Sequence, residues 1–170
     1  EVPDSAWFTN RIGVRKLSVE ELLRGACKPE DMLDPDSAKP GEYVIDQGKP
    51  NGASPGFRVR IGGTKKYMFK TDFVKEPERP SAAAVIGTAI YHGVGFNTSC
   101  EQIVYVDPNV FELKPGLKVT ANDGVTRPFD EAALDKVLNE AARRGDKRRF
   151  QASAWLEGYL LGPFKYEGTR

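Results

Sequence analysis

The sequence predicts an α+β fold: a twisted antiparallel sheet of about five strands, one buried helix packed on it, and an inserted amphipathic helix. Three observations support this prediction. Segments that alternate between apolar and polar side chains occur in pairs separated by turn residues, which is typical of antiparallel hairpins. One longer segment is apolar nearly all round, as in a buried helix, and another is apolar on one helical face only. Strand pairs combined with helices in this way are typical of α+β domains.

The composition is that of a single ordinary domain, residues 1–170. Hydrophobic residues make up 39% and charged residues 29% of the 170, which suits one core and excludes a disordered chain. Lys and Arg number 25 against 24 Asp and Glu, so no excess charge favours nucleic acid or an anionic membrane. The longest mostly apolar stretch, residues 81–96, is too short and too interrupted by glycine to span a bilayer. We therefore expect no nucleic-acid partner and no membrane span.

Residues 1–40 are expected to form an N-terminal arm and a short helix. The arm, residues 1–17, is too polar for a regular element, and we expect its aromatic side chains to dock on the domain. Ser18 and Glu21 have the spacing of a capping box, which predicts a helix over 19–24 that ends at Gly25. The chain begins with Glu-Val-Pro and has no apolar signal region, so we interpret it as a processed mature protein or an excised piece.

Residues 41–120 are expected to hold the sheet and the buried helix. Gly62 and Gly63 supply the positive φ angles of a tight hairpin turn. Ser81 is expected to cap a helix that runs to about His92 and is buried on most sides. A lone histidine at a helix C-terminus favours a structural role, because positive charge is stabilised there. The predicted strands are 41–46, 57–61, 66–71, 101–107 and 117–120.

The third of these strands places a lysine at its centre. Period-two alternation puts Tyr67 and Phe69 on one face, and Met68 and Lys70 on the opposite face. Lys70 is therefore either an edge residue facing water or a charge aimed at a ligand.

Residues 121–170 are expected to contain the amphipathic helix and a C-terminal hairpin. Apolar side chains recur at helical spacing over 130–144, Gly145 is suited to the position after the helix, and Arg143 and Arg144 suit its negative end. The basic run over 143–150 is interpreted as a solvated loop. The last segment indicates two strands joined by a turn at residues 157–158.

The two cysteines leave two alternatives open. Cys27 and Cys100 have no metal-ligand spacing, and they either pair in an oxidising compartment or remain two thiols. The scattered acidic pairs lie beside caps, prolines or turns, so no hydrolase site is predicted.

A glycine-rich loop, residues 48–56, joins two of the predicted strands. It lacks Walker A spacing, but its backbone donors and Lys49 could face phosphates in the way that kinase loops do; a mobile hairpin connection is the simpler interpretation.

The order of these segments resembles the N-terminal lobe of atypical kinases of the HipA-like kind, closest to a group of uncharacterised exported bacterial proteins. The likeness is spread over nearly the whole chain. It is carried by PDSAWFTNRIG, SVEELLRG, SPGFRVR, KYMFKTD, AAVIGTAIYHGVGFN, IVYVDP and LLGPFKYEGTR.

The resemblance implies a nucleotide site that is vestigial. Lys70 matches the strand lysine that holds the α- and β-phosphates, and the loop matches the phosphate cover. A kinase helix would offer a glutamate to Lys70, but residues 82–84 are alanines, and Glu76 and Glu78 precede a proline. The chain ends at Arg170, where a kinase would begin the lobe with its catalytic and metal-binding acids. We therefore expect no enzyme and no cofactor, with ATP bound only in a longer chain. The implied cofactor-binding residues are Lys70, Lys49, Gly52, Ser54 and Gly56.

The leading hypothesis is thus a non-catalytic, kinase-N-lobe-like accessory or interaction subunit of an envelope-associated assembly. It would be exported, in the periplasm or on the extracytoplasmic face of the membrane, with protein partners and peripheral attachment to a membrane complex. The alternative is the nucleotide-binding half of a larger atypical kinase, and a third option is a peptide or small-ligand binder that uses a sheet edge. Candidate contact residues are Trp7, Phe8, Trp155, Tyr159 and Phe164.

Overall fold

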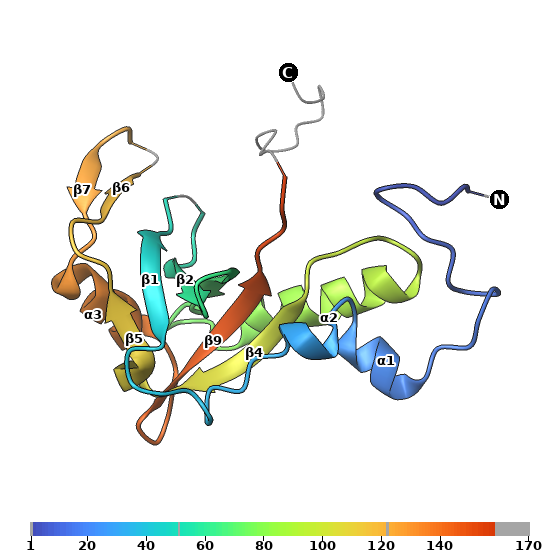
Figure 1. Cartoon of the computed structure of the whole chain (residues 1–170), viewed down its shortest axis with the longest axis horizontal. Helices are drawn as coiled ribbons and strands as arrows, with labels where there is room; N and C mark the ends of the chain where they lie inside the picture. The colour runs from blue at the N-terminus through green and yellow to red at the C-terminus, as the bar shows by residue number, and fades with distance from the viewer. Residues whose placement is uncertain (1, 51, 122, 159–170) are drawn as a thin grey trace.

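The computed structural model describes residues 2–50, 52–121 and 123–158, which form an α+β domain (Figure 1). Its helices are α1 (Val19–Arg24), α2 (Arg79–Gly93) and α3 (Glu131–Glu140), with 3-10 turns at Pro29–Asp31 and Pro108–Val110. Its strands are β1 (Tyr43–Gly48), β2 (Gly56–Ile61), β3 (Lys65–Lys70), β4 (Glu101–Val106), β5 (Phe111–Leu113), β6 (Lys118–Thr120), β7 (Thr126–Pro128), β8 (Arg143–Arg144) and β9 (Lys147–Ala154).

The main sheet is larger than predicted, and it is mixed. Seven strands take part, in the order β4-β9-β3-β2-β1-β5, with β8 paired to β9. The prediction of an antiparallel sheet of about five strands is wrong in this respect, because β5 pairs with β1 in parallel. After β4, the 3-10 turn at Pro108–Val110 leads into β5, which lies parallel to β1. The alternation of apolar and polar side chains within a strand does not specify which distant strand it pairs with. Strands β6 and β7 form a separate hairpin.

The central hairpin agrees with its prediction. Strands β2 and β3 are antiparallel, with Phe57 opposite Phe69 and Val59 opposite Tyr67. Gly62 and Gly63 connect them with φ angles of 57° and 76°. Tyr67 and Phe69 are buried, as the alternation predicted.

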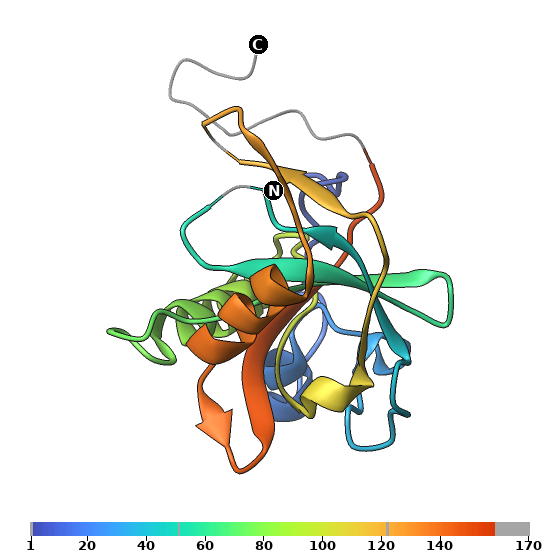
Figure 2. The same ribbon diagram turned by 90° about the vertical axis from the view of Figure 1, so that its left-hand side faces the viewer.

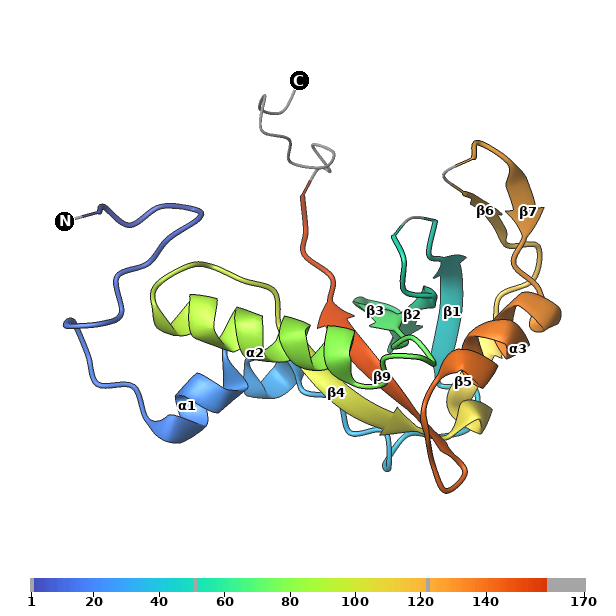
Figure 3. The same ribbon diagram turned by 180° about the vertical axis from the view of Figure 1, so that it is seen from behind.

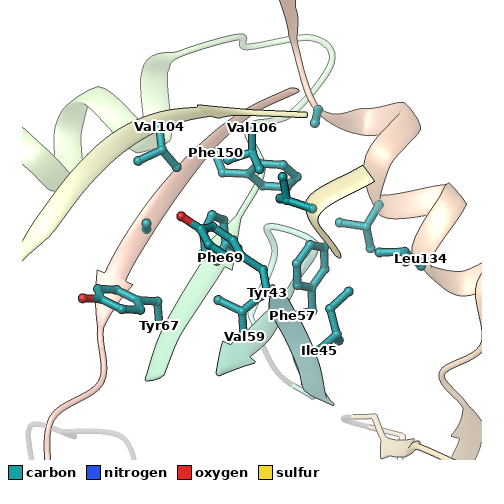
Figure 4. Close-up of a cluster of buried hydrophobic side chains, with 14 of the residues drawn as sticks. Tyr43, Ile45, Phe57, Val59, Tyr67, Phe69, Val104, Val106, Leu134 and Phe150 are labelled. Carbon is teal, nitrogen blue, oxygen red and sulfur yellow. The ribbon is translucent and has the colours of Figure 1, made fainter. Parts of the chain in front are cut away.

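The core lies on one face of this sheet and is rich in aromatic side chains (Figure 4). The rings of Phe57, Phe69 and Phe150 are all fully buried, with centroids 5.5–6.1 Å apart. Leu134 and Val137 of α3 belong to the same cluster. Figure 2 shows α3, in orange, in front of the strands that it covers.

The boundaries of α3 differ from those predicted. Asp130 caps the helix through a bond from the Ala133 amide, and the helix ends at Glu140 rather than near Arg144. Arg143 and Arg144 lie in β8, and Gly145 lies in the turn between β8 and β9. The basic run interpreted as a solvated loop is therefore a hairpin, because Arg143 and Arg144 pair with Arg148 and Lys147 of β9 across the Gly145 turn.

Helix α2 lies on the opposite face of the sheet. Arg149 alternates with Phe150 along β9, so its side chain leaves the core face, and its guanidinium donates to Ser81 Oγ of α2 at 2.6 Å. Ser81 is the third residue of the helix and is buried, whereas a helix start capped by Ser81 was predicted; the residue before the helix is Glu78.

The N-terminal segment follows its prediction in the capped helix but only partly in the arm, because one of the two arm aromatics expected to dock on the domain stays in solvent. Ser18 and Glu21 form the capping box of α1, and Gly25 ends the helix. Of the two arm aromatics, Phe8 packs edge-on against Phe96, with centroids 5.6 Å apart, while Trp7 is 76% exposed. The second strand of the predicted C-terminal hairpin, with Tyr159 and Phe164, lies outside the described residues.

Candidate functional site

The face of the sheet that α2 partly covers carries the lysine singled out by the sequence. Lys70 is paired with Gln151 of β9, and Gln151 lies on the same face as Arg149, two residues away. Lys70 is half-buried there, and the structure therefore places it on the α2 side of an interior strand rather than at a sheet edge.

The glycine-rich loop folds around its own lysine. Lys49 Nζ donates to the carbonyl oxygen of Ser54 at 2.6 Å. A Cβ added to Gly52 would lie 2.9 Å from the same Nζ. Burial lowers the pKa of Lys49, and the positive charge of nearby Lys70 lowers it further. The Lys49 amide donates to the Gly56 carbonyl at 3.1 Å, and Gly56 is paired with Lys70, so the two lysines flank the same glycine and a bound anion would relieve their repulsion.

The glycines at the two ends of this loop have packing roles. A Cβ at Gly56 would lie 2.2 Å from the carbonyl oxygen of Phe69 in the neighbouring strand. A Cβ at Gly48 would lie 2.3 Å from a methyl group of Val119 and 2.6 Å from the ring of Phe129. Contact between elements therefore explains these two glycines without any phosphate.

The acids that could partner Lys70 in a kinase are engaged elsewhere. Glu76 forms an ion pair with Arg79 at 2.8 Å. Glu78 lies 3.7 Å from the guanidinium of Arg149. Among the ion pairs formed by the described residues, none involves Lys70.

A buried polar cluster of Asp72, Ser81 and Arg149 attaches α2 to the sheet. Asp72 accepts hydrogen bonds from the Ser81 amide at 2.8 Å and from the Ser81 hydroxyl at 2.7 Å, and it forms an ion pair with Arg149. All three side chains are at most 7% exposed. The cluster has the partners that a buried charge needs, and we assign it a structural role. The cluster was not predictable from the sequence, because Asp72 and Arg149 are distant in the chain.

Helix α2 was predicted to be buried on most sides, and this prediction is wrong. Only Ser81 and Gly93 are buried, while Ile86 is 59% and Ile90 60% exposed. The helix contacts β4 and β9 on one side and α1 on another, as the ribbon in Figure 3 shows. These neighbours leave Ile86 and Ile90 in solvent.

This exposed surface forms one wall of an apolar groove of about 630 Å³. The second wall is α1, with Leu22 and Leu23, and the third is residues 12–17 of the arm. Twelve residues line the groove: Ile12, Gly13, Arg15, Leu17, Leu22, Leu23, Val85, Ile86, Ala89, Ile90, Gly93 and Val94. Arg15 is the one charged residue among them, and it is paired with Glu21 at 2.7 Å. We call this feature the α1–α2 groove.

His92 lies beside the groove in an environment that disfavours its protonation. Burial lowers its pKa, and the charges of Arg11 and Arg15 lower it further. Its Nδ1 atom is buried without a hydrogen-bond partner. Arg11 supplies the positive charge at this helix end by donating to the His92 carbonyl at 3.1 Å.

Cys27 and Cys100 are joined in a disulfide. The bond links the end of the α1 segment to the residue before β4. Both cysteines are 5% exposed.

A signal for the groove was present in the sequence. Helix α2 has no charged side chain between Arg79 and its C-terminus, so a single packed face leaves apolar side chains in solvent. The sequence alone could not show that α1 and the arm leave this surface open.

Within the described ranges, no group of three or more His, Cys, Asp or Glu is arranged to hold a metal ion. None of the helices there has the length and apolar character needed to cross a bilayer. Comparison with protein-family models, curated proteins and solved structures finds no match to this chain.

Proposed function

We propose that this chain is a non-catalytic interaction module, an accessory subunit of a larger assembly, which takes up an apolar helical segment of a partner protein in the α1–α2 groove. The observation that carries the proposal is the exposed apolar stripe of α2, where Ile86 and Ile90 are about three-fifths exposed. Contiguous apolar surface of this kind marks sites of association in soluble domains.

The shape of the groove favours a protein segment over a small molecule. Small-ligand pockets enclose most of their ligand, whereas the groove side chains Leu23, Ile86 and Ile90 lie mostly in solvent. The α2 wall presents rows at four-residue spacing, Ile86-Ile90-Val94 and Val85-Ala89-Gly93. Such rows accept the ridges of a second helix, which is the helix-in-groove mode of recognition.

The proposal includes a fold similar to the N-terminal lobe of a kinase. Lys70 lies on the sheet face that α2 covers, and a glycine-rich loop precedes its neighbouring strand. The absence of catalysis is supported by the engagement of Glu76 and Glu78 with arginines. An exported, periplasmic or extracytoplasmic location is supported by the disulfide, since such bonds persist in oxidising compartments.

Site-specific photo-crosslinking tests the proposal. A photoreactive phenylalanine analogue would replace Ile90 in the groove, and the matched control would replace Val74, a 73% exposed aliphatic residue outside it. We expect one discrete heterologous protein product from position 90 in native cells, lost in an Ile86→Glu background, and none from position 74. Equal products from both positions would contradict the proposal.

Two other results would show that something other than a partner protein occupies the groove. A crosslinked dimer of this chain would make the groove a self-association surface. Cosedimentation with anionic lipid vesicles that Ile90→Glu abolishes would make it a membrane-contact surface. Either result would overturn the proposal of a partner helix.

A second candidate function is the nucleotide-binding half of a larger atypical kinase. The proximity of Lys49 and Lys70 favours it, because two neighbouring cations suit a polyphosphate. In a longer chain that supplies a second lobe, Mg-ATP would raise the melting temperature, and Lys70→Ala would abolish the rise while Lys65→Ala at the start of β3 would not. An ATP effect indifferent to Lys70 would eliminate this candidate.

A further inference from the structure

We propose that the Cys27–Cys100 disulfide gates the α1–α2 groove. The oxidised chain presents the groove, and reduction releases α1 and dismantles it while the sheet stays folded. The inference concerns the regulation of the same site and rests on the proposed function.

The first observation is that α1 forms a wall of the groove, although its own side chains contribute little buried surface to hold it in place. It has six residues, and none of its side chains is buried. Helices this short are unstable in isolation, because nucleation costs more than one or two turns recover. Its capping box fixes the local helix and makes no contact with the sheet.

The second observation is that the groove requires a close fit between α1 and α2. A Cβ added to Gly25 would lie 3.3 Å from the Ala89 Cα, and one added to Gly93 would lie 3.0 Å from a methyl group of Leu22. Both glycines therefore allow α1 and α2 to lie in close contact. A small outward movement of α1 would break this contact and remove the α1 wall of the groove.

The third observation is the position of the disulfide. Cys27 follows Gly25 by two residues, and Cys100 immediately precedes β4. The carbonyl oxygen of Cys100 accepts a bond from the Ala154 amide at the end of β9, so this end of the bond belongs to the sheet. The disulfide thus ties a marginal helix to a rigid element.

Reduction should release α1 without releasing α2 or the core. The cluster of Asp72, Ser81 and Arg149 attaches the start of α2 to β9 independently of the cysteines. The core cluster of the described residues includes neither cysteine and no residue of α1 or α2. Beyond Cys27, Asp31 and Leu33 keep their own hydrogen bonds to Gln102 of β4, so the α1 wall of the groove is the part that the disulfide holds.

The redox step is a thiol–disulfide exchange with a dithiol reductant. A thiolate of the dithiol attacks one sulfur of the bond, the second thiol closes the reductant into its own disulfide, and Cys27 and Cys100 take up two electrons and two protons. Because both cysteines are nearly buried, the reductant reaches them when α1 moves away. A helix seated against Leu22 and Leu23 would restrain that movement and slow the reduction.

Hydrogen exchange measured by mass spectrometry tests the gate on the full chain. We compare the oxidised protein, the protein reduced with dithiothreitol, and the Cys27→Ala/Cys100→Ala double variant. We expect exchange over residues 18–26 to accelerate at least about tenfold in the last two, with residues 57–70 unchanged. Unchanged exchange over 18–26 would overturn the proposal, and so would parallel acceleration over 57–70, which would make the disulfide a support of the whole fold.

A second measurement separates this inference from the proposed function. The photo-crosslinking at position 90 is repeated with the double variant, and we expect the partner product to fall at least about tenfold. A full-strength product from the double variant would refute gating while leaving the docking function in place. Accelerated exchange over 18–26 with no product from the oxidised chain would support the dependence of the wall on the disulfide and refute the docking function.

Discussion

The two helical layers of this protein are held to its sheet by different physical means. On one face, α3 packs Leu134 and Val137 into a dry aromatic core. On the other, α2 is attached through the buried ionic cluster at its start, and α1 through a disulfide. Figure 1 shows α3 and the α1–α2 pair toward opposite ends of the molecule.

The contrast indicates how one small domain concentrates its buried apolar surface on one face of the sheet and leaves apolar surface exposed on the other. Burial of apolar side chains supplies most of the folding free energy, and it is concentrated under α3. The α1–α2 layer keeps much of its apolar surface in solvent, with Leu23, Ile86 and Ile90 each more than half exposed. Specific point attachments hold that surface in place, so it can be changed without unfolding the core.

The largest expected effect lies in the core. Phe150 is fully buried between Phe57, Phe69 and Phe111, and Phe150→Ala should lower the free energy of unfolding by about 3–5 kcal/mol. Leu23→Ala on the groove wall should change it by no more than about 0.5 kcal/mol, since Leu23 is 75% exposed. Urea denaturation measures both. Comparable losses would show that the two layers contribute equally to stability.

The next largest effect concerns the ionic attachment of α2. Asp72→Asn leaves the Arg149 charge buried without its close partner, which should cost about 3 kcal/mol. Hydrogen exchange should accelerate over 79–93 more than over 57–70. Asp123→Asn, which removes the partner of exposed Arg127, is the matched control and should leave stability nearly unchanged. Equal effects of the two variants would remove the distinction between a buried attachment and a surface pair.

The smallest expected effect is a pH dependence confined to the groove layer. The pKa of His92 is lowered in the folded protein, so below pH 6.5 the unfolded chain binds a proton that the folded chain resists. Stability should therefore fall on acidification, and relative to His92→Gln the native protein should lose melting temperature between pH 7.5 and 5.5. A difference in melting temperature between the two proteins that stays constant across that range would show that His92 has the same pKa in the folded and unfolded chains.

Local features were predictable from the sequence because neighbouring residues determine them. The capping box of Ser18 and Glu21 and the Gly62-Gly63 turn depend on a few consecutive residues, and both are found where they were predicted. The assignment of Tyr67 and Phe69 to the core face follows from strand alternation alone.

The candidate site was only partly predictable. Lys70 was correctly placed opposite the buried aromatic residues, and the structure adds its proximity to Lys49. The binding role of Lys70, Lys49, Gly52, Ser54 and Gly56 remains a prediction. The α1–α2 groove was not predicted, because a helix that is apolar nearly all round is expected to be buried on most sides.

The α+β class, the central hairpin and the short capped helix could be derived from the sequence, because patterns within short segments specify them. The parallel pairing of β5 with β1, the ion pair of Asp72 with Arg149, and the pairing of Cys27 with Cys100 became known from the folded chain. The same holds for the exposure of Ile86 and Ile90. The physical reason is that burial and pairing depend on which distant segments meet, and no local pattern specifies how much of an apolar helix its neighbours will cover.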